Sequence, residues 1–225
     1  MALFTVNSAL AATSATFSDI NSKTDYYDAI QWAVSEGIAT GYDDNSWKPN
    51  VCVKRAELVK MVLRARSGDG RAPADENFQS PFPDIKKTDW YWVYANKAKS
   101  LGIVAGYNDG YFRGYLCVNR AEAMKIAVNA MFEKPKLEVA ANDVYFDDKL
   151  VVDIKNNDWF APYARFLFKD RLIGTNHTVS AGNTVGTVPV IAKIYFYPAG
   201  EMTRKEVAQM LYLISKSANW HKLKN

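Results

Sequence analysis

One segment of about 50 residues occurs twice in this chain, and this repeat constrains the fold more than any other feature. Residues 17–66 align with residues 82–131 without a gap, and 18 of the 50 aligned positions are identical. The offset of 65 residues is constant, so that Arg55 corresponds to Arg120. A repeat of this length indicates a fold assembled from similar units that cover each other's apolar faces.

A third copy follows, and it carries an insertion. The residues around Trp159 match those around Trp90 at an offset of 69, whereas Arg204 matches Arg120 at an offset of 84. The two offsets differ by 15 residues, which places an insertion at about residues 176–195. Its Val, Ile and Tyr residues between Gly breaks predict an exposed hairpin or loop. We expect that its deletion leaves stability almost unchanged.

Each unit shows the pattern of helix, loop and helix. The second helices are expected at residues 54–66, 119–132 and 203–217, where apolar residues follow helical spacing and form one stripe. Three such stripes can be buried around a shared centre. The expected fold is therefore mainly α, with three helix-loop-helix repeats in a pseudo-threefold arrangement and a small β-like insertion in the third repeat.

The segments of the chain follow from these alignments. Residues 1–16 are apolar and end in small residues, which indicates a leader or the remnant of a signal peptide. The expected segments are the leader 1–16, the repeats 17–66, 82–132 and 146–217, and the tail 218–225.

Short motifs recur at matching places in the repeats. One is Gly106-Tyr-Asn-Asp-Gly110, and the other is an Arg-x-Glu motif at the start of each second helix. The three copies of the second motif are Val53-Lys-Arg-Ala-Glu57, Val118-Asn-Arg-Ala-Glu122 and Met202-Thr-Arg-Lys-Glu206.

These motifs resemble the S-layer homology (SLH) domain family over roughly residues 17–217. The resemblance implies three tandem SLH repeats in an exported protein of the cell surface, the cell wall or the S-layer. It also implies a non-catalytic anchoring module that binds an anionic, pyruvylated secondary cell-wall polysaccharide.

The arginine of the Arg-x-Glu motif has two chemical interpretations. At a helix start it lies beside free N–H groups and the positive end of the helix dipole, which attract anions. Alternatively, it pairs with a nearby carboxylate and only holds the loop. The resemblance implies a role in a groove between adjacent repeats for Arg55, Arg120 and Arg204.

The glutamates of the motif organise the helix starts. A capping box fits Asn119 with Glu122 and Thr203 with Glu206, but Lys54 before Glu57 cannot accept the backbone N–H bonds. The first repeat should therefore have the weakest cap, or a water or ligand at that place.

Glycine and aromatic residues are further candidates for ligand binding. Gly41 and Gly106 would let the backbone approach a ligand, while Tyr42 and Tyr107 either stack on a sugar or pack inward. Trp90 and Trp159 are either core or groove wall, and the core is favoured. The third repeat lacks the Gly-Tyr-x-Asp-Gly segment, with Gly174 as the nearest match, so the third groove should be altered and Arg204 should matter less than Arg120.

The two cysteines, Cys52 and Cys117, occupy equivalent positions. They can be buried small residues, a disulfide near a pseudo-symmetry axis, or part of a metal site. Two cysteines without a nearby histidine cannot fill a tetrahedral zinc site, so no metal and no cofactor is expected.

Other functional classes find little support. The chain has only two histidines and no catalytic or phosphate-binding motif, so no enzyme is expected. A net charge of +4 without a run of Lys and Arg argues against nucleic acid. The chain has no stretch of about 18 uninterrupted apolar residues, so no membrane span is expected.

Two alternatives to polymer binding stay open. In the first, the repeats pack against copies of themselves or another protein and build a surface layer. In the weaker second, the chain anchors a larger wall hydrolase or transporter.

Overall fold

The computed structural model describes residues 16–67, 80–133, 135–138, 143–147, 149–173, 177–180 and 193–217. The expected leader, the tail, Gly174 and most of the insertion lie outside these residues. The helices are α1 (Tyr27–Ser35), α2 (Arg55–Ser67), α3 (Trp92–Ser100), α4 (Arg120–Met131), α5 (Ala161–Lys169) and α6 (Arg204–Lys216). The strands are β1 (Tyr145–Phe146), β2 (Lys149–Val151), β3 (His177–Ser180) and β4 (Lys193–Tyr195). The predicted mainly α fold with a small β element is confirmed.

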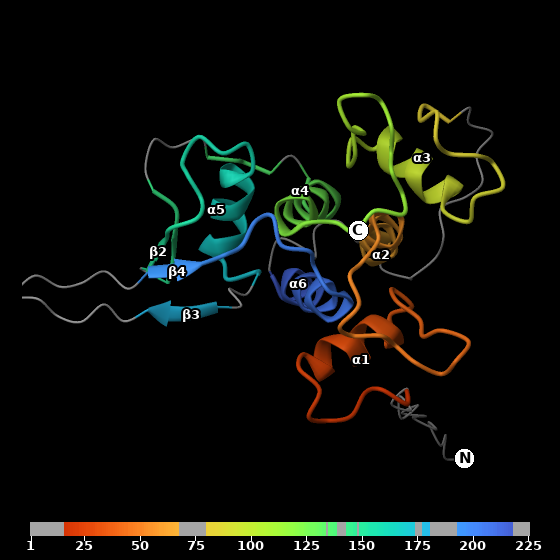
Figure 1. Cartoon of the computed structure of the whole chain (residues 1–225), viewed down its shortest axis with the longest axis horizontal. Helices are drawn as coiled ribbons and strands as arrows, with labels where there is room; N and C mark the ends of the chain where they lie inside the picture. Colours follow the sequence, from red (N-terminus) through yellow and green to blue (C-terminus); the bar gives the residue numbers. More distant parts are fainter. Residues whose placement is uncertain are drawn as a thin grey trace, which may run out of the picture.

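Helices α2, α4 and α6 form the centre of the molecule, and α1, α3 and α5 surround them (Figure 1). The central helices are in mutual contact. Their facing side chains, such as Val59, Ile126 and Leu211, are almost completely buried. The apolar stripes therefore meet at one centre, as their spacing predicts, because each stripe removes the others from water.

Each outer helix packs on the central helix of the preceding repeat. Helix α3 contacts α2, α5 contacts α4, and α1 closes the ring by contacting α6. An ion pair between Lys205 and Asp25, 3.0 Å long, also joins the last repeat to the first. Because each central helix is covered by a helix of another repeat, the hydrophobic core is shared by all three.

A triangle of backbone hydrogen bonds marks the pseudo-threefold axis. The N–H of Val53 donates to the carbonyl of Met202 at 2.9 Å, that of Met202 to Val118 at 3.0 Å, and that of Val118 to Val53 at 3.0 Å. These three residues are equivalent in the sequence alignment. The predicted pseudo-threefold arrangement is therefore present at atomic detail.

An aspartate fixes the loop before each central helix. The carboxylate of Asp84 accepts hydrogen bonds from the N–H groups of Phe112 at 2.8 Å and Arg113 at 2.7 Å. Asp19 and Asp153 hold the equivalent loops in the same way. This explains the aspartate that recurs in all three repeats, since a carboxylate can bind two neighbouring N–H groups at once.

The third repeat contains a four-stranded sheet in the order β1-β2-β4-β3. Strands β2 and β4 are parallel, and the two outer pairs are antiparallel. The sheet is larger than the predicted insertion, because β1 and β2 precede α5. Ile194 on β4 is only 2% exposed. The expectation that the whole inserted segment is dispensable is therefore wrong at its end, since β4 belongs to the core.

Candidate functional site

The N–H groups at the starts of the central helices are occupied by the next repeat. The N–H of Arg55 donates to the carbonyl of Leu116 at 2.8 Å, and that of Ala56 to Gly114 at 2.9 Å. The loop carbonyls of Gly200 and Pro198 serve α4, and those of Val51 and Pro49 serve α6. The expected anion site at free N–H groups is therefore wrong, because loop carbonyls already accept these hydrogen bonds.

The capping boxes follow the sequence. Asn119 accepts from the N–H of Glu122 at 2.8 Å, and Glu122 accepts from the N–H of Asn119 at 3.2 Å. Helix α6 also has a capping box. At α2 the N–H of Lys54 donates to Glu57 at 2.8 Å. Because a lysine side chain cannot return such a bond, α2 has the weakest side-chain cap, as expected.

The three motif arginines are all buried, with 6 or 7% exposure. Each extends onto the loop of the next repeat rather than its own. The guanidinium of Arg55 lies over the rings of Tyr107 and Phe112, 4.9 and 5.4 Å from their centres. Such contacts with aromatic faces stabilise a desolvated cation. The surroundings of each arginine therefore depend on the repeat that follows it.

A cavity of about 600 Å³ opens beside Arg55. It is formed by the loop after α3, the first turns of α4, and one tryptophan from the third repeat. Its lining brings together five residues that the sequence singled out, namely Arg55, Gly106, Tyr107, Glu122 and Trp159. We call this the Arg55 groove. It lies where residues of all three repeats meet.

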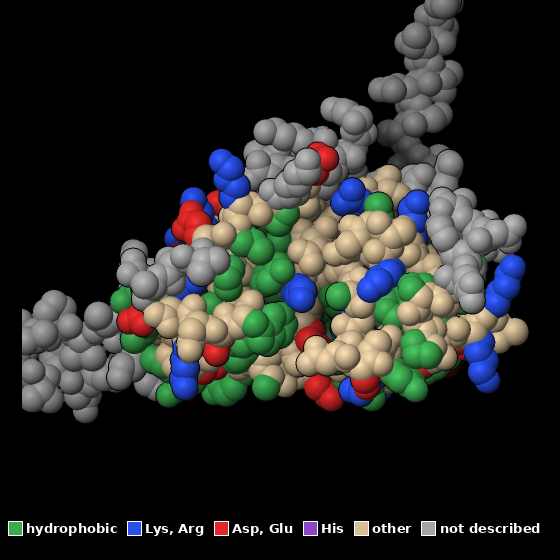
Figure 2. Space-filling model, turned by 90° about the horizontal axis from the view of Figure 1, so that it is seen from above, with side chains coloured by type: hydrophobic (Ala, Val, Ile, Leu, Met, Phe, Trp, Pro, Cys, Tyr) green, Lys and Arg blue, Asp and Glu red, His purple; other side chains and the backbone are tan. Residues whose placement is uncertain are grey.

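The acidic side chains of the Arg55 groove already have partners. The Tyr107 hydroxyl donates to Glu122 at 2.8 Å, and Arg113 pairs with Asp109. By contrast, the buried Nε of Arg55 has no hydrogen-bond partner within the described part of the chain. On the face seen in Figure 2, Lys and Arg side chains are scattered among hydrophobic ones rather than gathered in one tract. The cationic side chains that line the groove, Arg55, Arg113 and Lys125, therefore give its wall a local positive charge.

Trp159 lies on the wall of the Arg55 groove and Trp90 is exposed, so the favoured interpretation of both as core residues is wrong. Trp90 is 48% exposed and Trp159 is 55% exposed. The core position is taken in each case by the following aromatic residue, Tyr91 or Phe160, which the tryptophan ring meets edge-on. The ammonium group of Lys125 lies 5.4 Å from the ring centre of Trp159. An exposed indole beside a cation suits a sugar ring with a negative substituent.

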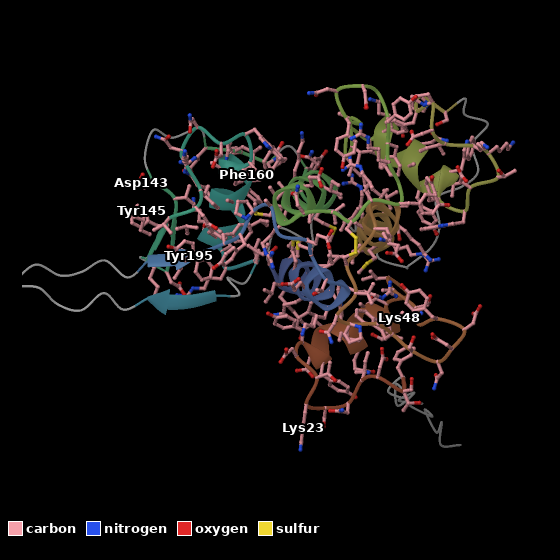
Figure 3. The ribbon with its side chains drawn as sticks, viewed as in Figure 1. Lys23, Lys48, Asp143, Tyr145, Phe160 and Tyr195 are labelled. Atoms are coloured by element: carbon pink, nitrogen blue, oxygen red, sulfur yellow. A yellow bond between two sulfur atoms is a disulfide. The ribbon has the colours of Figure 1, made fainter. Side chains whose placement is uncertain are left out.

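Residues equivalent to those around Arg55 surround Arg204, and we call this set of residues the Arg204 groove after its counterpart. The guanidinium lies over Tyr42 and Trp47, and its Nε also lacks a partner among the described residues. Lys60 lies over Trp90, as Lys125 lies over Trp159. Burial, followed by the charges of Arg64 and Arg204, lowers the pKa of Lys60. Lys48, labelled in Figure 3, lies over the Tyr42 ring at 4.1 Å.

The third arginine is neutralised. Arg120 forms an ion pair with Glu206, and both side chains are nearly buried. Its loop partner in the third repeat is Phe196, and the adjoining cavity is only about 20 Å³. The altered groove is thus the one around Arg120, not Arg204 as expected, because the incomplete loop of the third repeat lies beside Arg120.

The glycines are required by packing. A Cβ at Gly41 would collide with the ring of Phe17, and one at Gly106 would lie 2.9 Å from the ring of Phe82. Gly106 also has a φ of +91°, which disfavours other residues. Close backbone approach to the Phe-x-Asp phenylalanine therefore explains these glycines.

Sequence reasoning missed the lysines of the grooves. Lys60 and Lys125 are identical at the repeat offset, three residues after the motif glutamate. On a helix that spacing places them on the same side as the glutamate. This pattern could have identified them.

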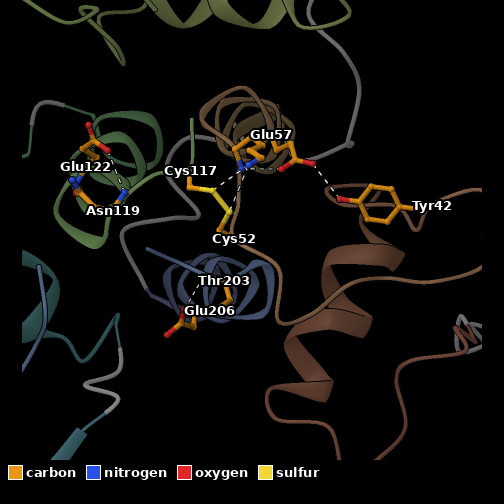
Figure 4. Close-up of a disulfide and its surroundings, with 9 residues drawn as sticks. Tyr42, Cys52, Glu57, Cys117, Asn119, Glu122, Thr203 and Glu206 are labelled. Carbon is orange, nitrogen blue, oxygen red and sulfur yellow. Dashed lines mark hydrogen bonds between the residues drawn. A yellow bond between two sulfur atoms is a disulfide. The ribbon is translucent and has the colours of Figure 1, made fainter. Parts of the chain in front are cut away.

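The cysteines form a disulfide, Cys52–Cys117, with their Cα atoms 5.7 Å apart (Figure 4). The favoured interpretation as two separate buried residues is therefore wrong. The carboxylate of Glu201 occupies the third equivalent position, within 4.8 Å of both sulfur atoms. Because the sulfur atoms are bonded to each other, they are not available as thiolate ligands for a metal.

Within the ranges that the structure describes, no helix is long and apolar enough to cross a membrane.

A family profile described as "S-layer homology domain" matches residues 16–59 and 81–124. These segments hold the Phe-x-Asp motif, the loop and the helix start of the first two repeats. The third repeat lies outside the matched segments, and its relation to the others rests on the equivalent hydrogen bonds.

Similar proteins include an amylopullulanase of Thermoanaerobacterium thermosulfurigenes, 30% identical over 85% of this chain. A surface layer protein of Brevibacillus choshinensis is 29% identical over 45% of the chain, and a cellulosome-anchoring protein of Acetivibrio thermocellus is 25% identical over 60%. The chain spans 9%, 9% and 30% of their respective lengths. The likeness therefore concerns one module of these larger proteins.

Proposed function

Because this chain belongs to the S-layer homology domain family, we propose that it is a non-catalytic module that anchors a surface protein by binding an anionic cell-wall polysaccharide. Surface layer and anchoring proteins among its relatives support an anchoring role at the cell surface. The similarity to an amylopullulanase covers only a small part of that enzyme and transfers no catalytic activity to this chain.

The Arg55 groove carries this proposal. A buried guanidinium with an unpartnered Nε, a lysine and an exposed indole line one cavity. A carboxylate accepts hydrogen bonds from a guanidinium strongly, and an indole face covers a sugar ring. A sugar bearing a carboxylate, such as a pyruvylated terminal residue, has both features. Arg55 and Lys125 would bind the carboxylate, while Trp159 would contact the ring.

The Arg204 groove is proposed as a second site, with Lys60 and Trp90 in the equivalent roles. The position of Arg120 is proposed as non-binding, because Glu206 already neutralises its charge. Glu57 and Glu122 would act by orienting the tyrosines rather than by touching the polymer, since each accepts the hydroxyl of Tyr42 or Tyr107.

A co-sedimentation experiment tests the class of ligand. The chain is mixed with purified wall sacculi before and after acid removal of the secondary polymers. We expect sedimentation only with untreated sacculi, and loss of sedimentation in the folded Arg55→Ala/Arg204→Ala variant. Assembly of the chain without any wall material, unchanged in that variant, would favour the surface-layer assembly alternative instead.

A further inference from the structure

The disulfide lies where the three repeats meet, and its two cysteines are only partly buried. Cys52, Cys117 and Glu201 occupy equivalent positions next to the central backbone triangle. Both cysteines are half-buried rather than enclosed, and Glu201 is exposed. Neither cysteine is therefore sealed within the hydrophobic core.

One lysine makes the two sulfur atoms unequal. The ammonium group of Lys54 lies 3.2 Å from Sγ of Cys117 and 3.7 Å from Sγ of Cys52. The residues equivalent to Lys54 are Asn119 and Thr203, which cap their helices. Lys54 has no such cap role, so its side chain is directed to the sulfur atoms.

A neighbouring cation lowers the pKa of a thiol, and the sulfur with the lower pKa leaves faster in thiol–disulfide exchange. Because Lys54 is closer to Cys117, it favours a thiolate at Cys117. The carboxylate of Glu201 disfavours a thiolate nearby, but it is exposed and hydrated, whereas Lys54 makes direct contact.

We propose that the Cys52–Cys117 disulfide is a polarised site of thiol–disulfide exchange. An external thiolate attacks Sγ of Cys52 and forms a new S–S bond with it. The Cys52–Cys117 bond breaks, and its electron pair stays on Cys117 as a thiolate beside the Lys54 ammonium. The products are a mixed disulfide at Cys52 and a free Cys117, so the step needs only a small thiol as co-reactant.

The backbone holds the leaving thiolate in place. Cys117 pairs with Lys54 and Cys52 pairs with Thr203 in isolated β-bridges. These pairings keep Cys117 beside the ammonium after the sulfur–sulfur bond opens. The link between the first two repeats can therefore open and close while the chain stays folded.

Peptide mapping tests the direction of attack. The oxidised full chain is exposed briefly to 2-mercaptoethanol, and free thiols are then alkylated under acidic quench. We expect the mercaptoethanol adduct on Cys52 and the alkyl group on Cys117 in at least roughly threefold excess over the reverse pattern. In Lys54→Gln, the two patterns should become nearly equal and the exchange slower.

Lys23→Gln is the matched control, because it removes the same charge from an exposed side chain that points away from the protein in Figure 3. It should keep the wild-type pattern. Equal or reversed labelling in the wild type, unchanged labelling in Lys54→Gln, or no exchange until the chain unfolds would each overturn the proposal.

Discussion

At the scale of residues, the motif arginine has two kinds of environment in the three repeats. Arg55 and Arg204 lie on aromatic rings with an unpartnered Nε, whereas Arg120 is paired with Glu206. The difference follows from the next repeat. Where the loop of that next repeat supplies a tyrosine, the tyrosine hydroxyl donates a hydrogen bond to the motif glutamate of the same repeat, as Tyr107 does to Glu122. Where the tyrosine is missing, as in the third repeat, the motif glutamate forms an ion pair with the arginine of the preceding repeat instead.

Arg120→Ala should therefore weaken folding rather than binding. Removing one partner of a buried ion pair leaves the other charge uncompensated, at a cost of about 3 kcal/mol. Chemical denaturation measures this loss in the free energy of unfolding. In Arg120→Ala/Glu206→Gln, where both charges are gone, part of the stability should return. Full stability together with lost polymer binding in Arg120→Ala would show that this arginine contacts the ligand.

Tyr91 predicts how stability changes at alkaline pH. Burial, followed by the charge of Asp89, raises the pKa of Tyr91 to about 12. Because the folded state favours the neutral phenol, this contribution to stability is fully present below about pH 10 and is lost as the pH rises towards 12. Denaturation midpoints across this range should fall less steeply in Tyr91→Phe. The same slope in both proteins would contradict this assignment.

At the scale of elements, the sequence predicts the helices well because their motifs recur. The central helix expected at residues 54–66 is observed as Arg55–Ser67, and its amphipathic stripe fixes the face that is buried. Strands β1 and β2 were not predicted, since two or three residues carry no detectable period. The disulfide was one of the open alternatives for the two cysteines, but the sequence could not select it, because the distance between their Cα atoms depends on how closely equivalent positions approach the pseudo-symmetry axis.

The disulfide should contribute strongly to stability. It closes a loop of 65 residues between the first two repeats, which restricts the unfolded chain by about 4 kcal/mol in the loop-entropy description. Cys52→Ser/Cys117→Ser should lower the free energy of unfolding by this order. Reductant should then destabilise the wild type but not the double variant. A loss below about 1 kcal/mol would show that the triangle of backbone bonds suffices.

At the scale of the whole molecule, the repeats interlock in a ring. Each repeat contributes to its neighbour an outer helix, loop carbonyls that accept hydrogen bonds, and aromatic rings on which the motif arginine lies. The third repeat makes these contacts with the first, which completes the ring. The sequence predicts three similar units, but it does not tell which loop receives which arginine. For this reason, the groove residues were identified from their motifs while the altered groove was assigned to the wrong arginine.

The central claim is that Arg55 and Arg204, but not Arg120, bind an anionic wall polymer. Equilibrium binding of purified secondary polysaccharide to the wild type, Arg55→Ala, Arg204→Ala, the double variant and Arg120→Ala tests it directly. We expect each single variant, Arg55→Ala or Arg204→Ala, to lose about 1.5–3 kcal/mol of binding free energy at its own groove. The double variant should show no specific binding, and binding to the wild type should weaken at high salt. Arg120→Ala should bind as the wild type where it is folded. Wild-type affinity in the folded double variant would contradict the account.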